Sequence, residues 1–370
     1  MSPTDPPFRA EHVGSLLRPA AIHDARARYR AGEIDRAELR EVESREIDAM
    51  LPLLAATGMR SMTDGEFRRE WFHLDFLEQL GGITIEGTIG STSDSQETVH
   101  MAPPRITVTD RLTHDHPIQV ADYRYVAERA PEGTLTKVAI PSPTMAHFRG
   151  GRSGIDIQAY PDLDQFFDDL ARVYREEIVA LYDAGCRYLQ LDDTNLAYLC
   201  DPGMRQGAVD RGDDPDELPR TYAALINDAL AERPDDLTVG IHLCRGNFRS
   251  TFFASGGYEP VAEVLFSELD VDAYFLEYDD ERSGDFAPLR FVPSHKTVVL
   301  GLVTSKFPEL EPADELKARV DEAAGYVALD QLCLSPQCGF SSTIHGNVMT
   351  DEQQWAKLRH VVEVADDIWS

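Results

Sequence analysis

The sequence has few cysteines, only five in 370 residues, at positions 186, 200, 244, 333 and 338. Such a sparse and odd-numbered set does not form a disulfide framework. The N-terminus also lacks the charged-then-apolar pattern of a signal peptide, and no apolar run approaches the ~18 residues that cross a bilayer. We therefore expect a cytoplasmic protein with reduced thiols and no membrane partner.

Basic residues are also scarce. The chain has 35 Lys and Arg against 65 Asp and Glu, for a net charge of −30. This balance argues against nucleic acid and anionic membranes as partners, since both are polyanions and no basic patch is evident. A solvated acidic surface accounts for most of the charge. The composition, with 42% hydrophobic residues, is that of a soluble globular enzyme that binds small molecules, and an oligomer is compatible with it.

One pattern is repeated along the chain: a helical stretch ends at Gly or a polar turn, and a short apolar run with a polar tip follows. Residues 45–58 and 169–185 are two such helical stretches, ending at Gly58 and Gly185. The pattern predicts an α/β protein with a (β/α)₈ barrel, in which the polar strand ends form the reactive rim. A doubly wound open sheet is the alternative, but no Gly-x-Gly-x-x-Gly fingerprint opens a strand–helix turn. The eight predicted strands are residues 12–16, 61–66, 138–143, 189–193, 240–244, 275–280, 300–306 and 333–339.

We expect one domain over residues 1–370, because no linker rich in Pro, Gly or Ser divides the chain. Two excursions interrupt the repeat. Residues 83–126 alternate like strands and predict an inserted hairpin region after the second strand. Residues 194–216 are expected to form a long loop after the fourth strand, either a lid or a plain surface loop.

The ends of three predicted strands carry residues that could bind a metal. His242 and Cys244 are two apart on a strand, so their side chains point the same way. Glu277 and Cys338 lie at the ends of the sixth and eighth strands. One His, two Cys and one Glu suit zinc, which accepts N, S and carboxylate O ligands, whereas magnesium and calcium prefer oxygen alone. Singly, each residue is as well explained by burial or an ion pair.

The segments "EHVGSLLRP", "TDGEF", "LQLDD", "IHLC", "FLEYDDERSG" and "LSPQCG" occur in that order. In this they resemble the catalytic half of cobalamin-independent methionine synthase, and especially its short, single-barrel relatives. The resemblance covers roughly residues 8 to 345 and implies that His242, Cys244, Glu277 and Cys338 hold zinc. It further implies a methyltransferase that activates a thiol, most simply homocysteine, for attack on a methyl donor such as a methylfolate or a methylated corrinoid.

The same resemblance implies roles for substrate-binding residues. Glu66 and Asp192 match positions that hold the ammonium of homocysteine, and Ser15 beside Gly14 matches the element that binds its carboxylate. A structural ion pair of Glu66 or Asp192 with Arg68, Arg69 or another neighbour is the simpler alternative. Asp192, at the reactive rim, is also a candidate catalytic residue.

The chain departs from the family in two respects. Lys306, in "GLVTSK", stands about where the synthase carries a catalytic His, and a lysine is a poor proton shuttle unless it is desolvated. His12 and His73 are possible substitutes, or are structural. The full synthase also has an additional N-terminal barrel that helps bind the polyglutamylated folate, which leaves the methyl donor of this chain open.

Three other functions are compatible with parts of the sequence. Alkyl transfer to coenzyme M would need cations for the sulfonate, which Arg18, Arg245 or Lys306 could supply. A lyase like uroporphyrinogen decarboxylase shares the barrel but needs no ligand cysteines. A non-catalytic zinc site would usually be closed and peripheral. The carboxylates Glu66 and Asp192 favour homocysteine as the thiol.

Overall fold

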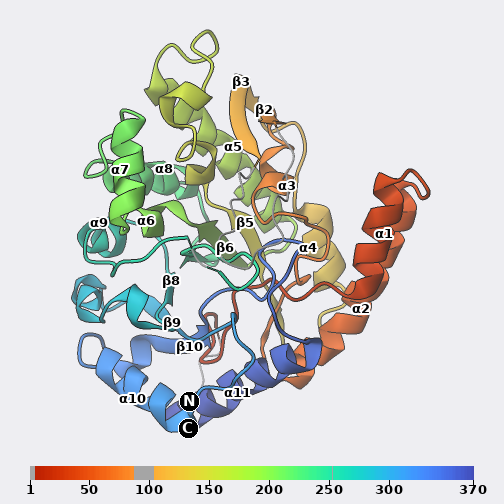
Figure 1. Ribbon diagram of the computed structural model, residues 1–370, viewed down its shortest axis with the longest axis vertical. Helices are drawn as coiled ribbons and strands as arrows, with labels where there is room; N and C mark the ends of the chain where they lie inside the picture. Colours follow the sequence, from red (N-terminus) through yellow and green to blue (C-terminus); the bar gives the residue numbers. More distant parts are fainter. Residues whose placement is uncertain (1–4, 87–103, 252) are drawn as a thin grey trace, which may run out of the picture.

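The computed structural model describes residues 5–86, 104–251 and 253–370. At its centre is a six-stranded parallel sheet in the order β10-β9-β8-β7-β6-β5, and helices lie around the outside of the strands (Figure 1). The chain is therefore an α/β protein with a parallel sheet. The sheet strands are β5 (Val138–Pro141), β6 (Tyr188–Asp193), β7 (Thr238–Leu243), β8 (Ala273–Glu277), β9 (Thr297–Val303) and β10 (Leu332–Pro336).

The two helices analysed from sequence end where expected. One lies within α2 (Arg36–Ala56), and the other within α5 (Leu163–Asp183). Gly58 and Gly185 follow them at φ 92° and 106°, in the left-handed region that glycine adopts without strain. The other helices are α1 (Ala20–Arg30), α3 (Leu74–Leu77), α4 (Val120–Ala127), α6 (Asn195–Tyr198), α7 (Pro202–Asp210), α8 (Leu218–Leu230), α9 (Ala262–Ser267), α10 (Ala313–Ala323) and α11 (Asp351–Trp369). In the described part of the chain, none is both long and apolar enough to cross a membrane.

The strands of the parallel sheet are buried on both faces, as continuous apolar runs such as "TVVLGLV" in β9 predict. One face packs its leucines and isoleucines into the large hydrophobic cluster shared with the helices. The opposite face carries a smaller cluster that includes Tyr188, Phe275 and Val299. Side chains alternate between the two faces, so every second residue toward the end of β6, β7 and β8 points to the face away from the helices.

The two edges of the sheet are extended by short pairings. β1 (Ser61–Met62) pairs in parallel with β4 (Leu135–Thr136), which leads directly into β5, and Ala10 forms a parallel bridge to Leu334 of β10. The predicted first strand, residues 12–16, is wrong as a strand: its backbone makes no ladder. The segment instead bends past β1, where Leu16 N donates to Gly65 O (3.0 Å). Closure of the strands into an eight-stranded barrel stays a prediction.

The inner face of the sheet contains a buried ion pair well before the strand ends. Lys137 Nζ lies 3.4 Å from Glu11 Oε2, and both side chains have no solvent exposure. The hydroxyls of Tyr188 and Ser61 also donate to the Glu11 carboxylate, at 3.0 and 2.9 Å. A buried charge with this many partners is satisfied. We therefore assign the Glu11–Lys137 pair a structural role.

The excursion at residues 83–126 includes one antiparallel strand pair, so the predicted hairpin region is observed in part. β2 (Gly81–Glu86) and β3 (Arg105–Thr113) pair antiparallel. Residues 87–103 of the predicted insertion lie outside the described residues. Its last part is wrong as a strand, because residues 120–126 belong to helix α4, whose Val120, Tyr123 and Val126 are buried at helical spacing.

The predicted long loop at residues 194–216 is also wrong, since it contains helices α6 and α7. The side chain of Asp201 accepts hydrogen bonds from the backbone N–H groups of Gly203 and Met204, and Pro202 occupies the first helical turn. This is a standard helix start, and it folds the segment over the carboxyl end of β6.

Candidate metal centre

His242 and Cys244 come from the end of β7. His242 is paired in register with Asp192 of β6 on one side and Phe275 of β8 on the other. Cys244 continues the strand by donating its backbone N–H to Asp193 O (2.7 Å). Because the two residues are separated by one position, both side chains lie on the inner face, as the sequence predicts.

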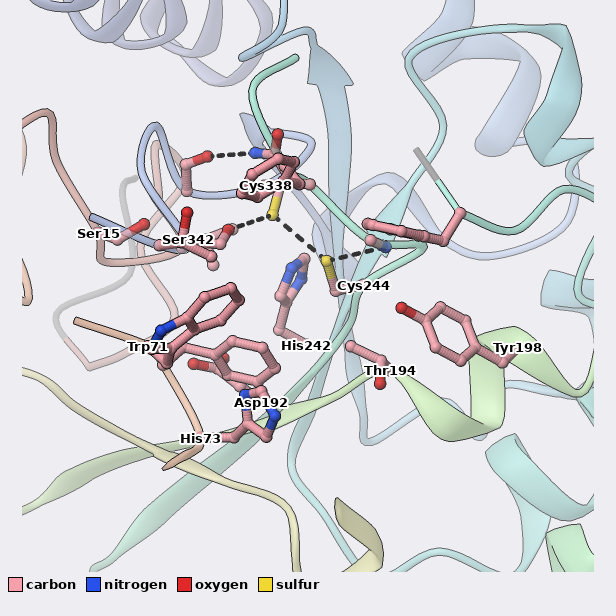
Figure 2. A pocket seen from close by; sticks show the side chains of 18 of the residues that line it. Ser15, Trp71, His73, Asp192, Thr194, Tyr198, His242, Cys244, Cys338 and Ser342 are labelled. Atoms are coloured by element: carbon pink, nitrogen blue, oxygen red, sulfur yellow. Dashed lines mark hydrogen bonds between the residues drawn. The ribbon is translucent and has the colours of Figure 1, made fainter. Parts of the chain in front are cut away.

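Glu277 and Cys338 complete a cluster with these two residues. One ligand atom from each of the four side chains can be chosen so that all lie within 4.8 Å of one another. The sulfurs of Cys244 and Cys338 are 3.5 Å apart. None of the four residues is more than 7% exposed. Figure 2 shows His242, Cys244 and Cys338 converging on one point.

The free donor atoms of this cluster fit a metal ion. Neither ring nitrogen of His242 has a hydrogen-bond partner in the described residues. Glu277 Oε1 accepts from Arg245 N (3.0 Å), whereas Oε2 accepts no hydrogen bond and has Arg282 Nη2 at 3.6 Å. Buried polar atoms are normally satisfied, so nitrogen and oxygen atoms without hydrogen-bond partners beside two sulfurs are available as metal ligands. The donor set can hold a metal.

The pKa shifts of Cys338 and His242 are also compatible with metal binding. The hydrogen bond from the Cys244 thiol lowers the pKa of Cys338 well below its usual range, despite burial. Burial lowers the pKa of His242, but the Cys338 sulfur, Asp192 and Glu277 outweigh it and raise this pKa to about 9. Both shifts favour the charged forms of the two side chains, negative for Cys338 and positive for His242. The deprotonated sulfur is the form of cysteine that binds a metal.

Asp192 lies next to this centre, and Glu66 approaches it from the loop after β1. Both residues line the same cavity as His242, Cys244 and Cys338. Gln190 Nε2 donates to Asp192 Oδ1 (2.7 Å), which fixes the carboxylate. Glu66 has φ 57°, a left-handed conformation that is rare for residues with a Cβ, and such strain is concentrated at functional sites.

The simple ion-pair explanation for Glu66 accounts for only part of its surroundings. Arg68 pairs with Asp122 (2.7 Å), not with Glu66. Arg69 donates to Gln119 Oε1 (3.0 Å) and to Ala139 O (2.6 Å). Glu66 Oε2 lies 3.8 Å from Arg18 Nη2 and accepts no hydrogen bond from the described residues. This oxygen is free to receive a ligand.

Both carboxyl groups are harder to ionise than in water. Burial raises the pKa of Glu66 to about 7, although Arg69 and Arg18 pull in the opposite direction. Burial likewise raises the pKa of Asp192, against the effect of His242 and the Gln190 hydrogen bond. A buried carboxyl pair with raised pKa values gains most from a ligand that brings positive charge.

Ser15 lines the same cavity, beside the loop that carries Cys338. Its hydroxyl accepts a hydrogen bond from Ser341 N (3.3 Å), and its carbonyl accepts one from Phe340 N (2.9 Å). A Cβ at Gly339 would lie 1.9 Å from the Ser15 hydroxyl oxygen. Only glycine at 339 permits this close approach, which brings Ser15 to the cavity wall.

Of the other predicted basic groups, only His73 lines the cavity. Lys306 is buried, with Nζ 3.9 Å from Asp279 Oδ2 and without a hydrogen bond, and it is not among the cavity-lining residues. His12 binds Ser61 O (2.9 Å), outside the cavity wall. Arg18 and Arg245 donate to backbone carbonyls and also stand outside that wall. His73 lines the cavity, and neither of its nitrogens has a hydrogen-bond partner.

The cavity that joins these groups has a volume of about 310 Å³. Sequence reasoning missed its aromatic wall, because these residues lie in irregular segments or, for Tyr198, in the short helix α6, where no apolar periodicity is evident. In Figure 2, Trp71 lies on one side of the metal cluster, and the hydroxyl of Tyr198 points toward Cys244 from the other. The wall can therefore hold a flat or apolar group against the cluster. Its aromatic members are Trp71, Phe72, Phe148, Tyr198, Phe248 and Phe253.

Comparison with known proteins gives consistent matches. Residues 8–367 match the family model described as the catalytic domain of cobalamin-independent synthase. The chain is 48% identical to the uncharacterized protein YxjH of Bacillus subtilis, covering 98% of this chain and 95% of YxjH. It is 24% identical to a methionine synthase of Pyrococcus abyssi, over 88% and 84% of the two chains. A solved structure from Listeria monocytogenes, provisionally assigned as a vitamin-B12-independent methionine synthase, is 42% identical with a TM-score of 0.79, covering 98% of each chain.

Proposed function

Because the chain belongs to the family of cobalamin-independent synthase catalytic domains, we propose that it transfers a methyl group to the thiol of homocysteine, with zinc bound by His242, Cys244, Glu277 and Cys338. We also propose that its parallel strands close into the (β/α)₈ barrel of this family. The observation that carries the functional proposal is a single cavity with the metal cluster, a buried carboxyl pair and an aromatic wall.

Zinc is the metal that suits this donor set, since nitrogen, carboxylate oxygen and two sulfurs are its usual ligands. When bound, it would supply a Lewis acid that lowers the pKa of the substrate thiol, so that the thiol reacts as a thiolate. In this proposal the cavity residues orient the amino acid, exclude water and place the donor in line with the sulfur.

The amino acid end of homocysteine is assigned to Glu66, Asp192 and Ser15. The two carboxylates suit an ammonium group, and the free Glu66 Oε2 offers an unused acceptor. The Ser15 hydroxyl and the neighbouring backbone suit the substrate carboxylate. In the reaction, a sulfur–carbon bond forms and the bond from the methyl carbon to the donor atom breaks. The electron pair of the broken bond stays on the donor atom, which then takes up a proton.

Lys306 has an electrostatic role in this proposal. Burial raises the pKa of Glu277, and the charge of Lys306 opposes this shift. The same charge adds to the lowering of the pKa of Cys338, which is due first to the Cys244 hydrogen bond. It thereby offsets part of the negative charge of two cysteines and a glutamate. A direct proton transfer to the substrate does not fit its position outside the cavity wall.

Alkyl transfer to coenzyme M is the second candidate, because two arginines, Arg149 and Arg211, line the cavity and could face a sulfonate.

Calorimetry distinguishes the two thiols. Homocysteine or coenzyme M is added to zinc-loaded protein in buffers of different ionisation enthalpy, and the protons released are counted. We expect about one proton released with homocysteine alone, as thiol becomes thiolate. Proton release with coenzyme M alone would mean that coenzyme M, not homocysteine, is the acceptor. No proton release with either thiol would contradict thiol activation.

The raised pKa of Glu66 predicts how binding of the product methionine depends on pH. As pH rises through about 7, Glu66 loses its proton and gains the charge that attracts the ammonium group. The dissociation constant of methionine is therefore expected to fall about tenfold between pH 6 and pH 8. Titration calorimetry measures it.

Glu66→Gln should weaken methionine binding and remove this pH dependence. Glu70→Gln, a change of a half-exposed neighbour that pairs with Arg30, is the control and should retain it. If the dependence survives in Glu66→Gln, another group titrates and the assignment of Glu66 is wrong.

A further inference from the structure

Two arginines in the cavity wall are paired with acidic groups less closely than most arginines in the described part of the chain: Arg149 has no such partner, and Arg211 has one at 3.7 Å. Arg149 is exposed and forms no hydrogen bond or ion pair of its side chain among the described residues. Arg211 has only Asp213 Oδ2 nearby, 3.7 Å from its Nε, and its Nε and Nη2 make no hydrogen bond. In a chain of net charge −30, cations without close acidic partners beside one cavity are unexpected. They indicate that an anion binds there.

The two arginines approach the cavity from the β5 and β6 side. Arg149 follows the short helix η1 (Pro143–Ala146) after β5, and Arg211 follows α7, after β6. Phe148 connects them to the interior: Arg211 Cζ is 5.1 Å from the centre of its ring, and the ring of Tyr198 is 6.1 Å from it. Tyr198 in turn points toward Cys244 (Figure 2). An aromatic path therefore leads from the metal cluster to the arginines.

Two of the three residues assigned to the amino acid substrate, Ser15 and Glu66, come from a different part of the cavity wall, whereas the third, Asp192, ends β6. Ser15 and Glu66 belong to the N-terminal segment and to the loop after β1, and in Figure 2 Ser15 lies across the cluster from Tyr198. An anion at Arg149 and Arg211 is thus well placed to belong to the second substrate. The aromatic path between is suited to a flat ring, which stacks on aromatic side chains.

We propose, on the basis of the proposed function, that Arg149 and Arg211 form a subsite that binds an anionic group, a carboxylate or a phosphate, of the methyl donor. Guanidinium groups bind both anions through paired hydrogen bonds. They also offset locally the repulsion that the acidic chain exerts on an anionic donor. Two donors supply such groups: a methylfolate through its glutamate carboxylates, and a methylated corrinoid through its phosphodiester. The cavity of about 310 Å³ admits a pterin ring but is small for a corrin macrocycle.

The test compares Arg149→Gln and Arg211→Gln with wild type, and Arg359→Gln, an exposed change on α11, is the control. Initial rates are measured with homocysteine and with three donors: methyltetrahydrofolate carrying one or three glutamates, and methylcobalamin. Each cavity variant is expected to raise the KM of the active anionic donor about tenfold or more, as loss of a charged hydrogen bond does. The KM of homocysteine should change less than twofold, and Arg359→Gln should match wild type.

The donor arms identify the source of the anion. An effect that grows from one to three glutamates assigns the subsite to carboxylates, whereas an effect confined to methylcobalamin assigns it to the phosphodiester. Donor KM values unchanged in both variants would overturn the proposal. A rise in the KM of homocysteine, or loss of coenzyme M binding, would overturn it by assigning the arginines to the thiol substrate.

Binding without turnover separates this inference from the proposed function. Tetrahydrofolate triglutamate, which has no methyl group to transfer, is titrated into each protein by calorimetry. If wild type binds it and the two variants bind it at least tenfold more weakly, the subsite stands even when no methyl transfer is found. If transfer occurs, all four proteins bind it equally, and the donor KM values, methylcobalamin included, are unchanged in both variants, the subsite is wrong and the methyltransferase proposal stands.

Discussion

Replacing His242 with Ala, or Cys338 with Ser, is expected to abolish both metal binding and methyl transfer. Each change removes one of four donors that converge within 4.8 Å. Activity should fall by about 10³-fold or more, because a thiol with a pKa of ~8.5 is mostly protonated at pH 7 and loses its positioning as well. Metal content by elemental analysis, together with initial rates, measures the effect. The fold should persist, since these side chains lie at strand ends rather than in the large hydrophobic cluster.

Cys333→Ala is the matched control for this experiment. Cys333 is a buried cysteine on the same strand, β10, but it packs against Tyr188 and Phe275 in the smaller cluster. It should retain a full equivalent of zinc and near wild-type activity, with a modest loss of thermal stability. If Cys338→Ser or His242→Ala kept tightly bound zinc at full stoichiometry, the ligand set proposed here would be wrong.

Asp192→Asn is expected to weaken homocysteine binding far more than metal binding. Loss of one charged partner at a buried site costs ~2–5 kcal/mol, so the KM of homocysteine should rise by about 10²-fold. The asparagine oxygen can still accept the hydrogen bond that Gln190 donates, which preserves the local structure. Steady-state kinetics and zinc analysis on the same preparation give both quantities.

Glu43→Gln separates a binding effect from a general loss of stability. Glu43 is also a fully buried carboxylate, paired with Arg26 at 3.2 Å, but it lies on α2 and outside the cavity. The Glu43→Gln substitution should lower the melting temperature and leave the KM of homocysteine unchanged. An Asp192→Asn protein with normal affinity for homocysteine would return Asp192 to a purely structural role.

The proximity of the four candidate ligands could be predicted from sequence because strand geometry is periodic, while their binding of a metal stays a prediction. His242 and Cys244 share a face through the two-residue repeat, and Glu277 ends the neighbouring strand. The position of Cys338 is less regular, since it follows β10 in a turn, and only the order of motifs along the chain indicated it. The helix ends at Gly58 and Gly185 were predictable for a similar reason, because a C-terminal glycine in the left-handed region is a local property.

The errors arise where local patterns compete with tertiary contacts. Residues 12–16 are apolar enough for a strand, but they bend past β1 so that Ser15 can reach the loop after Cys338. In residues 194–216, the Asp201–Pro202 pair is a helix-start signal that the polar composition obscured. Arg149 and Arg211 carry no sequence signal, because their significance is the absence of close partners, which only coordinates reveal.

The left-handed backbone at Glu66 has a consequence for how the chain can evolve. A residue with a Cβ at φ 57° costs about 1 kcal/mol or more relative to glycine, so Gly or Asn at this position would favour the folded state. Selection for stability alone would therefore remove the glutamate. A descendant that no longer needed to recognise an amino acid would be expected to lose this side chain early and to become more stable in doing so. A relative that retains Glu at position 66 despite this cost in stability would therefore still be under selection for substrate binding.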